Sequence, residues 1–198
     1  LKPTVKVETI GDAIWETLRN ERTNDRIVSE GQHENLYYRV VKRTVDLGFA
    51  VFVFVLFWWL LIALGILIRT QSSGPAIFAQ KRVGRRGQIF TCYKFRTMRL
   101  GTPNVGTHDA PQDAVTPIGK FLRSSKLDEL PQVVNILFNQ VSWIGPRPCL
   151  PSQEVLVAER DRRGVYAVRP GITGPAQLAG IDMSTPIELA KADAGYAA

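Results

Sequence analysis

The sequence has few cysteines and lacks the common glycine-rich nucleotide-binding motifs. Its 198 residues include two cysteines, Cys92 and Cys149, and no CxxC pair. Two isolated cysteines exclude a disulfide framework and indicate reduced thiols, as in cytosolic proteins. Neither the P-loop pattern nor GxGxxG occurs, so any nucleotide must be held in another way. The lack of internal repeats and low-complexity tracts also excludes a repeat architecture.

Charge is absent from one long stretch, residues 47–68, which contains no Asp, Glu, Lys or Arg. As a helix this stretch would be about 33 Å long, enough to cross the hydrocarbon core of a bilayer. It shows no polar face, and it lies too far from the N-terminus and lacks the cleavage site of a signal peptide. The sequence therefore predicts a polar N-terminal extension (1–36), a membrane-inserted helix (37–72) and a second domain (73–198). The last residues are expected to be helical, and the natural chain is expected to continue beyond them.

Basic residues flank the uncharged stretch on both sides. Arg39, Lys42 and Arg43 precede it, and Arg69 follows it. Basic flanks favour the cytoplasmic side of a membrane. A straight span would carry one basic cluster across the membrane, whereas a re-entrant helix would leave both on one side. The charge pattern favours re-entry and leaves a straight span as the alternative.

The whole chain is basic, with a formal net charge of +7. Such a charge indicates an anionic partner: nucleic acid, phospholipid headgroups or a phosphorylated substrate. Residues 81–99 contain seven basic residues and no acidic one, in two β-prone runs around a turn that predict a hairpin. A basic surface against anionic lipid would explain these charges without any chemistry. The uncharged stretch and the lack of an aromatic-rich basic surface argue against nucleic acid as the partner.

Two adjacent acidic residues, Asp128 and Glu129, begin a helical pattern. Neighbouring helical residues point about 100° apart, so the two carboxylates are expected to have separate roles. Pro131 is tolerated in the first turn of a helix, which places Asp128 at or near a helix N-terminus. A capping box formed by Ser125 and Asp128 is the alternative. The predicted apolar face of the helix comprises Leu127, Leu130, Val133, Val134, Leu137 and Phe138.

Cationic residues accompany this acidic pair along the sequence. They are Lys94, Arg96, Arg123 and Arg147. Guanidinium groups bind phosphate oxygens in a two-pronged way, and carboxylates among cations suit Mg²⁺-assisted phosphoryl transfer. The cations are also expected to keep Asp128 ionised. The plain alternative is that Asp128 caps a helix and Glu129 is a solvated surface charge. His108 and Asp109 could ligate a metal, but a lone His-Asp pair in a turn-rich loop is more typical of ordinary surface.

Four ordered motifs resemble the bacterial sugar transferases, the monotopic phosphoglycosyl transferases. They are KRxGxxGxxFxxYKFRTM, FLRSSKLDELPQVVNIL, WIGPRP and RPGITGPAQ, and the match covers about residues 38–177. The resemblance implies an enzyme that transfers a sugar-1-phosphate from a nucleotide diphosphate sugar, such as a UDP-sugar, to undecaprenyl phosphate, initiating glycoconjugate synthesis. It also implies Mg²⁺ as cofactor, contact with inner-membrane lipid, and a catalytic domain on the cytoplasmic face of the bacterial inner membrane.

The resemblance assigns roles to individual residues. Asp128 matches the family nucleophile, which forms a covalent phosphosugar intermediate. Glu129 matches the other member of the dyad, which supports metal binding or proton handling, so that both residues are the implied Mg²⁺ ligands. Contacts to substrate phosphates are implied for five residues: Lys94, Arg96, Arg123, Arg147 and Arg169.

The expected fold is a helix-rich α+β fold in which a membrane-inserted, re-entrant helix precedes a small catalytic domain with a short β-hairpin. One feature departs from the family pattern. Family members commonly bend the membrane helix at a Ser-Pro pair, whereas this chain has Trp58 and Trp59 at that place and no proline within residues 47–68. The alternative function is a non-enzymatic membrane adaptor whose basic hairpin binds anionic lipid. Such an adaptor would be insensitive to the loss of both carboxylates.

Overall fold

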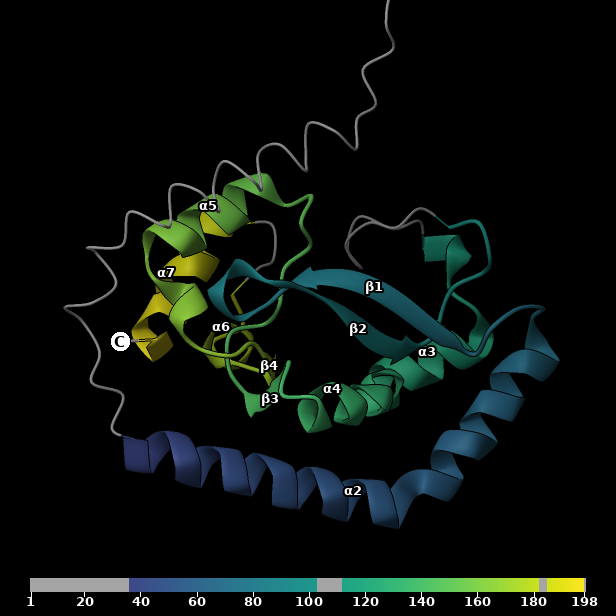
Figure 1. The fold of residues 1–198 in the computed structure, drawn as a ribbon. Coiled ribbons are helices and arrows are strands. Elements are labelled where there is room, and N and C mark those ends of the chain that lie inside the picture. Colours follow the sequence, from purple (N-terminus) through teal and green to yellow (C-terminus); the bar gives the residue numbers. More distant parts are fainter. Residues whose placement is uncertain (1–35, 103–111, 182–184, 198) are drawn as a thin grey trace, which may run out of the picture. The chain divides into compact units, whose positions relative to one another are not determined.

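The structure, a computed structural model, describes residues 36–102, 112–181 and 185–197 (Figure 1). All described residues belong to one compact unit, Asn35–Ala198. Residues 1–35 of the predicted extension, and the pair formed by His108 and Asp109, lie outside the described residues.

The described part is helix-rich, with one long apolar helix and two small two-stranded sheets, as the α+β expectation requires. Short 3₁₀ turns at Arg85–Gly87, Gln112–Ala114 and Val165–Ala167 lie between the main elements. The main elements are α2 (Leu36–Gln71), β1 (Ile77–Val83), β2 (Ile89–Phe95), α3 (Pro117–Ser124), a 3₁₀-helix (Leu127–Gln132), α4 (Val133–Leu137), β3 (Ser142–Ile144), α5 (Glu154–Arg162), β4 (Gly171–Thr173), α6 (Pro175–Leu178) and α7 (Pro186–Ala197).

The first turns of α2 are bonded to the segment that contains α4 and β3. Asp46 is buried in α2 and accepts a hydrogen bond from the Ser142 hydroxyl at 2.8 Å. Lys42 donates to the same hydroxyl oxygen at 2.5 Å, and Arg43 donates to the carbonyl oxygen of Ile136 at 2.9 Å. Two of the basic residues that suggested membrane topology therefore also bind the rest of the unit.

The C-terminal end of α2 is held by a different part of the same unit. Arg96 follows β2, and its guanidinium donates to the carbonyl oxygens of Ser72 and Ser73, each at 2.8 Å. The two halves of α2 also differ in their apolar packing: Ala50 belongs to one cluster of buried apolar side chains, and Leu64 belongs to another. Both ends of α2 thus bind one compact unit.

The helix α2 bends about halfway along its length, although it contains no proline (Figure 1). In this middle part the indole Nε1 of Trp59 donates to the carbonyl oxygen of Leu56 at 2.9 Å. A side chain that bonds a carbonyl of the preceding turn competes with the backbone ladder and is one of the recognised causes of a helix bend. This bond, together with the packing of both arms on the unit, accounts for a bend without the Ser-Pro pair.

Replacing Trp59 by phenylalanine is expected to lower the free energy of unfolding by about 1 kcal/mol, because the Leu56 carbonyl loses its indole donor. Trp58→Phe is the matched control: Trp58 is 53 % exposed and Trp59 56 %, and the Trp58 indole donates to no described residue. The measurement is the thermal unfolding of both variants in detergent. Equal shifts for the two variants would show that the indole bond does not support the bend.

The predicted hairpin is present as the antiparallel pair β1 and β2, in register from Ile77↔Phe95 to Val83↔Ile89. Side chains alternate along a strand, so that Phe90 and Cys92, which are buried, share a face of β2 with Lys94. This face packs on the 3₁₀-helix and α4. The hairpin therefore carries Lys94 to the segment that contains the acidic pair.

Two of the sequence motifs lie side by side as parallel strands. β3 in the WIGPRP segment pairs with β4 in the RPGITGP segment, with Ser142 opposite Gly171 and Ile144 opposite Thr173. The approach is so close that a Cβ on Gly145 would lie 2.5 Å from the carbonyl oxygen of Arg169. Glycine is therefore required at Gly145, and the pairing places the loop that follows β3 beside β4.

Candidate active site

The acidic pair lies in the first turn of the 3₁₀-helix Leu127–Gln132. The preceding helix α3 ends where the Ser125 hydroxyl donates to the carbonyl oxygen of Phe121 at 2.8 Å. Lys126 then adopts a left-handed conformation (φ 59°), which redirects the chain into the 3₁₀-helix. The expectation that Asp128 lies at a helix start is confirmed. The alternative capping box is wrong, because Ser125 bonds backward to α3 and no side chain caps this helix.

Glu129 is the fixed member of the pair. Its side chain is buried, and its Oε1 atom accepts hydrogen bonds from Arg147 Nη2 at 2.6 Å and from Lys94 Nζ at 2.8 Å. Burial alone would raise the pKa of Glu129, but the charges and hydrogen bonds of Arg147 and Lys94 lower that pKa to about 2. The two cations therefore favour the ionised form of Glu129 and set its orientation, and the alternative of a solvated surface charge does not hold.

Lys94 is brought to Glu129 by the packing of β2 on the 3₁₀-helix. Burial lowers the pKa of Lys94, and the neighbouring Arg147 lowers it further, whereas Glu129 raises it. Asn135 secures this contact from α4: its amide group accepts a hydrogen bond from the Tyr93 backbone N–H at 3.1 Å and donates to the carbonyl oxygen of Thr91 at 2.7 Å. Asn135 is fully buried and was not singled out in the sequence, although a polar residue within the apolar VVNIL segment could have indicated it.

Asp128 differs from its neighbour in that it is half-buried and no described residue donates a hydrogen bond to its carboxylate. Burial raises the pKa of Asp128, and the opposing charges of Lys94, Arg123 and Arg147 do not outweigh it. Burial thus outweighs the cations in setting the pKa of Asp128, and the expectation that the cations keep this carboxylate ionised stays a prediction. A carboxylate with an elevated pKa and unengaged oxygens is a better nucleophile than one fixed by two cations.

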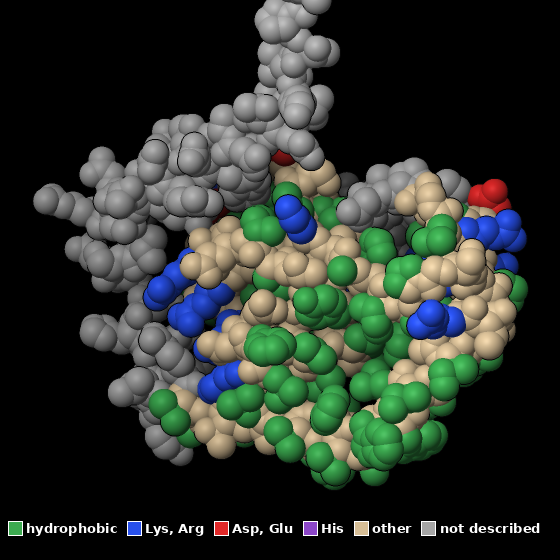
Figure 2. Space-filling view, turned by 45° about the vertical axis from the view of Figure 1, so that its right-hand side comes forward, with side chains coloured by type: hydrophobic (Ala, Val, Ile, Leu, Met, Phe, Trp, Pro, Cys, Tyr) green, Lys and Arg blue, Asp and Glu red, His purple; other side chains and the backbone are tan. Residues whose placement is uncertain are grey.

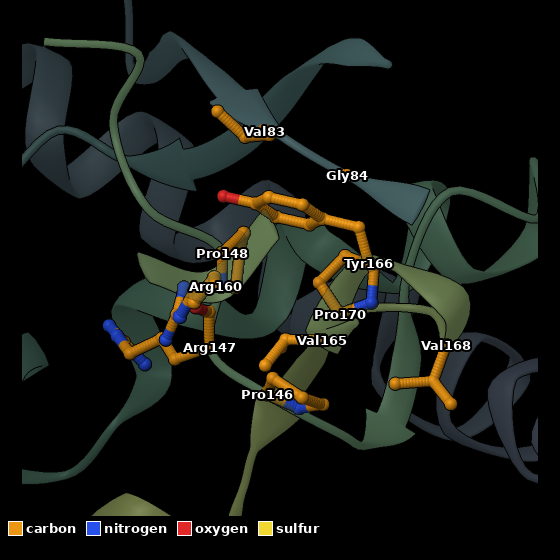
Figure 3. Close-up of a pocket in the computed structure, with 10 residues that line it drawn as sticks. All are labelled: Val83, Gly84, Pro146, Arg147, Pro148, Arg160, Val165, Tyr166, Val168 and Pro170. Atoms are coloured by element: carbon orange, nitrogen blue, oxygen red, sulfur yellow. The ribbon is translucent and has the colours of Figure 1, made fainter. Parts of the chain in front are cut away.

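Arg147 is fixed between Pro146 and Pro148 in the loop after β3, and its side chain extends from this loop beside that of Arg160 (Figure 3). One terminal nitrogen donates to Glu129, and the other donates to the carbonyl oxygen of Ile172 on β4 at 3.3 Å. Its side chain remains 25 % exposed. Arg147 therefore orients Glu129 while part of its guanidinium can still contact a ligand.

The other three cationic residues singled out in the sequence have different positions. Arg123 lies near Asp128, where burial lowers the pKa of Arg123 and the carboxylate opposes that shift; its Nε donates to Thr97 Oγ1 at 2.9 Å. Arg96 is buried and binds the end of α2, so the structure does not bring it into the Glu129 cluster. Arg169 is half-buried directly before Pro170 and the strand β4. The cluster around the acidic pair thus comprises Lys94, Arg123 and Arg147.

Within the part of the chain that the structure describes, the acidic pair offers carboxylate oxygens to a divalent cation. Among the described residues no group of three or more His, Cys, Asp or Glu side chains could hold a metal ion. The oxygens of Asp128 and the Oε2 atom of Glu129 have no described donor. This donor set suits Mg²⁺, which is commonly bound by one or two carboxylates together with substrate phosphates.

Comparison with known proteins identifies the family to which these features belong. The model of the family described as "Bacterial sugar transferase" matches residues 37–198. A protein of Aeromonas hydrophila named UDP-N-acetylgalactosamine-undecaprenyl-phosphate N-acetylgalactosaminephosphotransferase is 37 % identical over 80 % of the chain and 40 % of its own length. A UDP-glucose:undecaprenyl-phosphate glucose-1-phosphate transferase of Caulobacter vibrioides is 38 % identical over 71 % of the chain and 54 % of its own length.

A third relative, the undecaprenyl-phosphate galactose phosphotransferase of Salmonella typhimurium, is 33 % identical over 72 % of the chain and 33 % of its own length. The chain thus spans between a third and just over a half of these curated relatives. The family model, in contrast, covers α2, the hairpin, the acidic pair and the segments that hold Arg147 and Arg169. The chain belongs to the bacterial sugar transferase family.

Proposed function

We propose that the chain transfers a sugar-1-phosphate from a nucleotide diphosphate sugar to undecaprenyl phosphate through a covalent intermediate on Asp128. The main observation behind this proposal is that the two acidic side chains differ in their hydrogen bonding. Glu129 is fixed by Lys94 and Arg147, while Asp128 beside it has no described donor. The names of the three relatives, all undecaprenyl-phosphate sugar phosphotransferases, support the donor and acceptor classes.

The proposed reaction has two displacements at one phosphorus atom. A carboxylate oxygen of Asp128 attacks the phosphorus that bears the sugar, and the bond from this phosphorus to the bridging oxygen of the diphosphate breaks. The nucleoside monophosphate leaves with the bonding electrons. A phosphate oxygen of undecaprenyl phosphate then attacks the same phosphorus and releases the Asp128 carboxylate, which leaves a lipid diphosphate sugar as product.

The cationic residues would compensate the charge of the phosphates in both steps. Arg147 and Lys94 form ion pairs with Glu129, which is next to the proposed nucleophile, and Arg123 lies near the nucleophile, Asp128, itself. Fixed cations in a partly buried site stabilise developing negative charge without reorganisation. We also propose that Asp128 and Glu129 hold Mg²⁺, which when bound would neutralise the diphosphate and its leaving oxygen.

The helix α2 is proposed to insert into the membrane and to return to the same side. Val40–Gln71 is long and apolar enough to cross a membrane, and only 17 % of its most apolar window is buried in the structure. Figure 2 shows apolar side chains gathered along the lower edge, where α2 runs, with Lys and Arg side chains above this edge. Because both ends of α2 bind the same unit, re-entry leaves the active site on one face, which we propose is the cytoplasmic face of the inner membrane.

The topology is tested by labelling single cysteines in intact cells. Cysteines placed at Asn35 and Ser73, before and after the apolar stretch, are both expected to resist a membrane-impermeant maleimide until the inner membrane is opened. Each new cysteine is placed in a chain whose two free cysteines, Cys92 and Cys149, have been replaced, and this cysteine-free chain is the control. Labelling at Asn35 alone in sealed cells would mean a straight span and would refute re-entry.

The function itself is tested with purified protein in detergent, undecaprenyl phosphate, Mg²⁺ and a panel of UDP-sugars that includes the glucose, galactose and N-acetylgalactosamine forms. The expected result is release of nucleoside monophosphate with at least one donor, dependent on the lipid acceptor for continued turnover. A chain that binds anionic vesicles but releases no nucleotide with any donor would instead be the non-enzymatic adaptor.

A further inference from the structure

The loop that carries Arg147, residues 146–149, is held along its whole backbone. Its four successive carbonyl oxygens all accept a hydrogen bond, each from a different residue. The pairs are Pro146 with the Gly171 N–H (2.9 Å), Arg147 with Arg160 Nη1 (2.7 Å), Pro148 with Arg82 Nη1 (2.9 Å) and Cys149 with the Val83 N–H (3.0 Å). Three separate parts of the unit, β1, α5 and β4, therefore fix this loop. The bond at the Arg147 carbonyl is the one that acts directly on the residue that binds Glu129.

Arg160 makes this bond from a buried position. It lies on α5 and is 2 % exposed, and its Nη2 atom donates to Asp193 Oδ2 of α7 at 2.5 Å. Asp193 is fully buried and lies on the same face of α7 as the buried residues Leu189 and Ala197. A buried guanidinium is tolerated only where a charge and hydrogen-bond acceptors compensate it. Asp193 therefore keeps Arg160 in place. One terminal nitrogen of Arg160 binds Asp193, and the other binds the carbonyl oxygen of Arg147.

These contacts form a continuous path from α7 to the acidic pair. Asp193 binds Arg160, Arg160 binds the backbone of Arg147, and the Arg147 side chain binds Glu129. Figure 3 shows the side chains of Arg160 and Arg147 next to each other in the wall of a pocket that Tyr166 also lines. Arg162 and Arg163 also bind a carboxylate, that of Glu159, but these ion pairs do not belong to the path.

We propose that Arg160 and Asp193 are positioning residues for the transfer reaction, and that α7 thereby belongs to the catalytic apparatus. The inference rests on the proposed function. Arg160 sets the backbone of Arg147, so that the guanidinium reaches Glu129 and the substrate phosphates at the correct angle. A displacement of about 1 Å in a positioning contact costs up to about 100-fold in rate. An ion pair that served only to stabilise the fold would affect turnover only through the fraction of folded protein.

The test uses two variants of the full chain and one matched control. Asp193→Asn keeps the shape of the side chain and removes its charge. Arg160→Lys keeps the positive charge beside Asp193, and therefore favours folding, but a single ammonium group cannot reproduce the two directed contacts. Glu159→Gln removes a carboxylate that two arginines of the same helix bind at the surface. Folding is verified by thermal unfolding, and rates are measured well below each midpoint.

Nucleotide release is measured in single turnovers with radiolabelled UDP-sugar at saturating concentration. We expect a 10- to 100-fold lower rate for Asp193→Asn and Arg160→Lys, and an unchanged rate for Glu159→Gln. In an Arg147→Lys background the same two changes are expected to lower the rate of nucleotide release less than twofold, because they act through Arg147. Thermal midpoints should fall equally in both backgrounds.

The outcomes separate this inference from the proposed function. Folded variants that release nucleotide at the wild-type rate would overturn the positioning role. If Asp193→Asn and Arg160→Lys lower the rate by the same factor in the Arg147→Lys background as in the wild type, the positioning role is also overturned. Arg160 and Asp193 would then act independently of Arg147. A wild-type protein that releases no nucleotide with any donor would refute the proposed function, and the inference with it.

Discussion

Replacing Asp128 by asparagine is expected to reduce sugar-phosphate transfer by more than about 1,000-fold. The amide keeps the size of the side chain but cannot form the covalent bond to phosphorus. Because no described residue donates to the Asp128 carboxylate, this change breaks no hydrogen bond within the described structure. The thermal midpoint should therefore remain close to that of the wild type. Turnover is measured as nucleoside monophosphate released with donor, Mg²⁺ and undecaprenyl phosphate.

Asp113→Asn is the matched control for this variant, because Asp113 is exposed and belongs to a separate 3₁₀ turn. Its turnover should equal that of the wild type. An Asp128→Asn protein that retains a tenth or more of wild-type turnover would exclude Asp128 as the nucleophile. Transfer would then have to occur directly between donor and acceptor, with the carboxylate in a supporting role.

Arg147→Lys is expected to lower turnover by about 100- to 1,000-fold, which corresponds to about 3 to 4 kcal/mol of lost transition-state stabilisation. The guanidinium donates at once to Glu129 and to the Ile172 carbonyl, and it has further N–H groups for a phosphate. An ammonium group on a shorter, less directional side chain cannot meet both partners. The measurement is the rate of nucleotide release at saturating donor concentration.

Arg162→Lys provides the corresponding control, since Arg162 also binds a glutamate but is exposed on α5. This variant should turn over at the wild-type rate. If Arg147→Lys also retains full turnover at saturating donor, Arg147 only shapes the loop after β3 and does not contact the reacting phosphates.

The local features of the fold could be predicted because they depend on residues close in sequence. The two β-prone runs around a turn predicted the hairpin, and the long uncharged stretch predicted the apolar helix α2. The position of Asp128 at a helix start followed from Pro131. The sequence also placed the carboxylate pair among cations, but it assigned Lys94 and Arg147 to substrate phosphates and not to the Glu129 carboxylate that they bind in the structure.

The remaining features depend on contacts between distant segments, which no local pattern encodes. Arg96 looks like any other basic residue of the hairpin, and only the fold shows that it binds the end of α2. The same holds for Arg160, whose partner Asp193 is 33 positions away. The resemblance placed a bend of α2 at Trp58 and Trp59, but the sequence could not give its support, because the hydrogen bond there comes from an indole group and not from a proline. Sequence reasoning also gave Asp128 a cationic environment but could not weigh that environment against burial.

The most direct test of the account is the intact mass of the protein after incubation with donor sugar and Mg²⁺ in the absence of lipid acceptor. The account predicts that wild-type protein gains the mass of one phosphosugar, that peptide mapping places it on Asp128, and that later addition of undecaprenyl phosphate removes it. Asp128→Asn protein should gain no mass. Nucleotide release that requires the lipid acceptor from the start, with no adduct on the wild-type protein, would contradict the covalent mechanism.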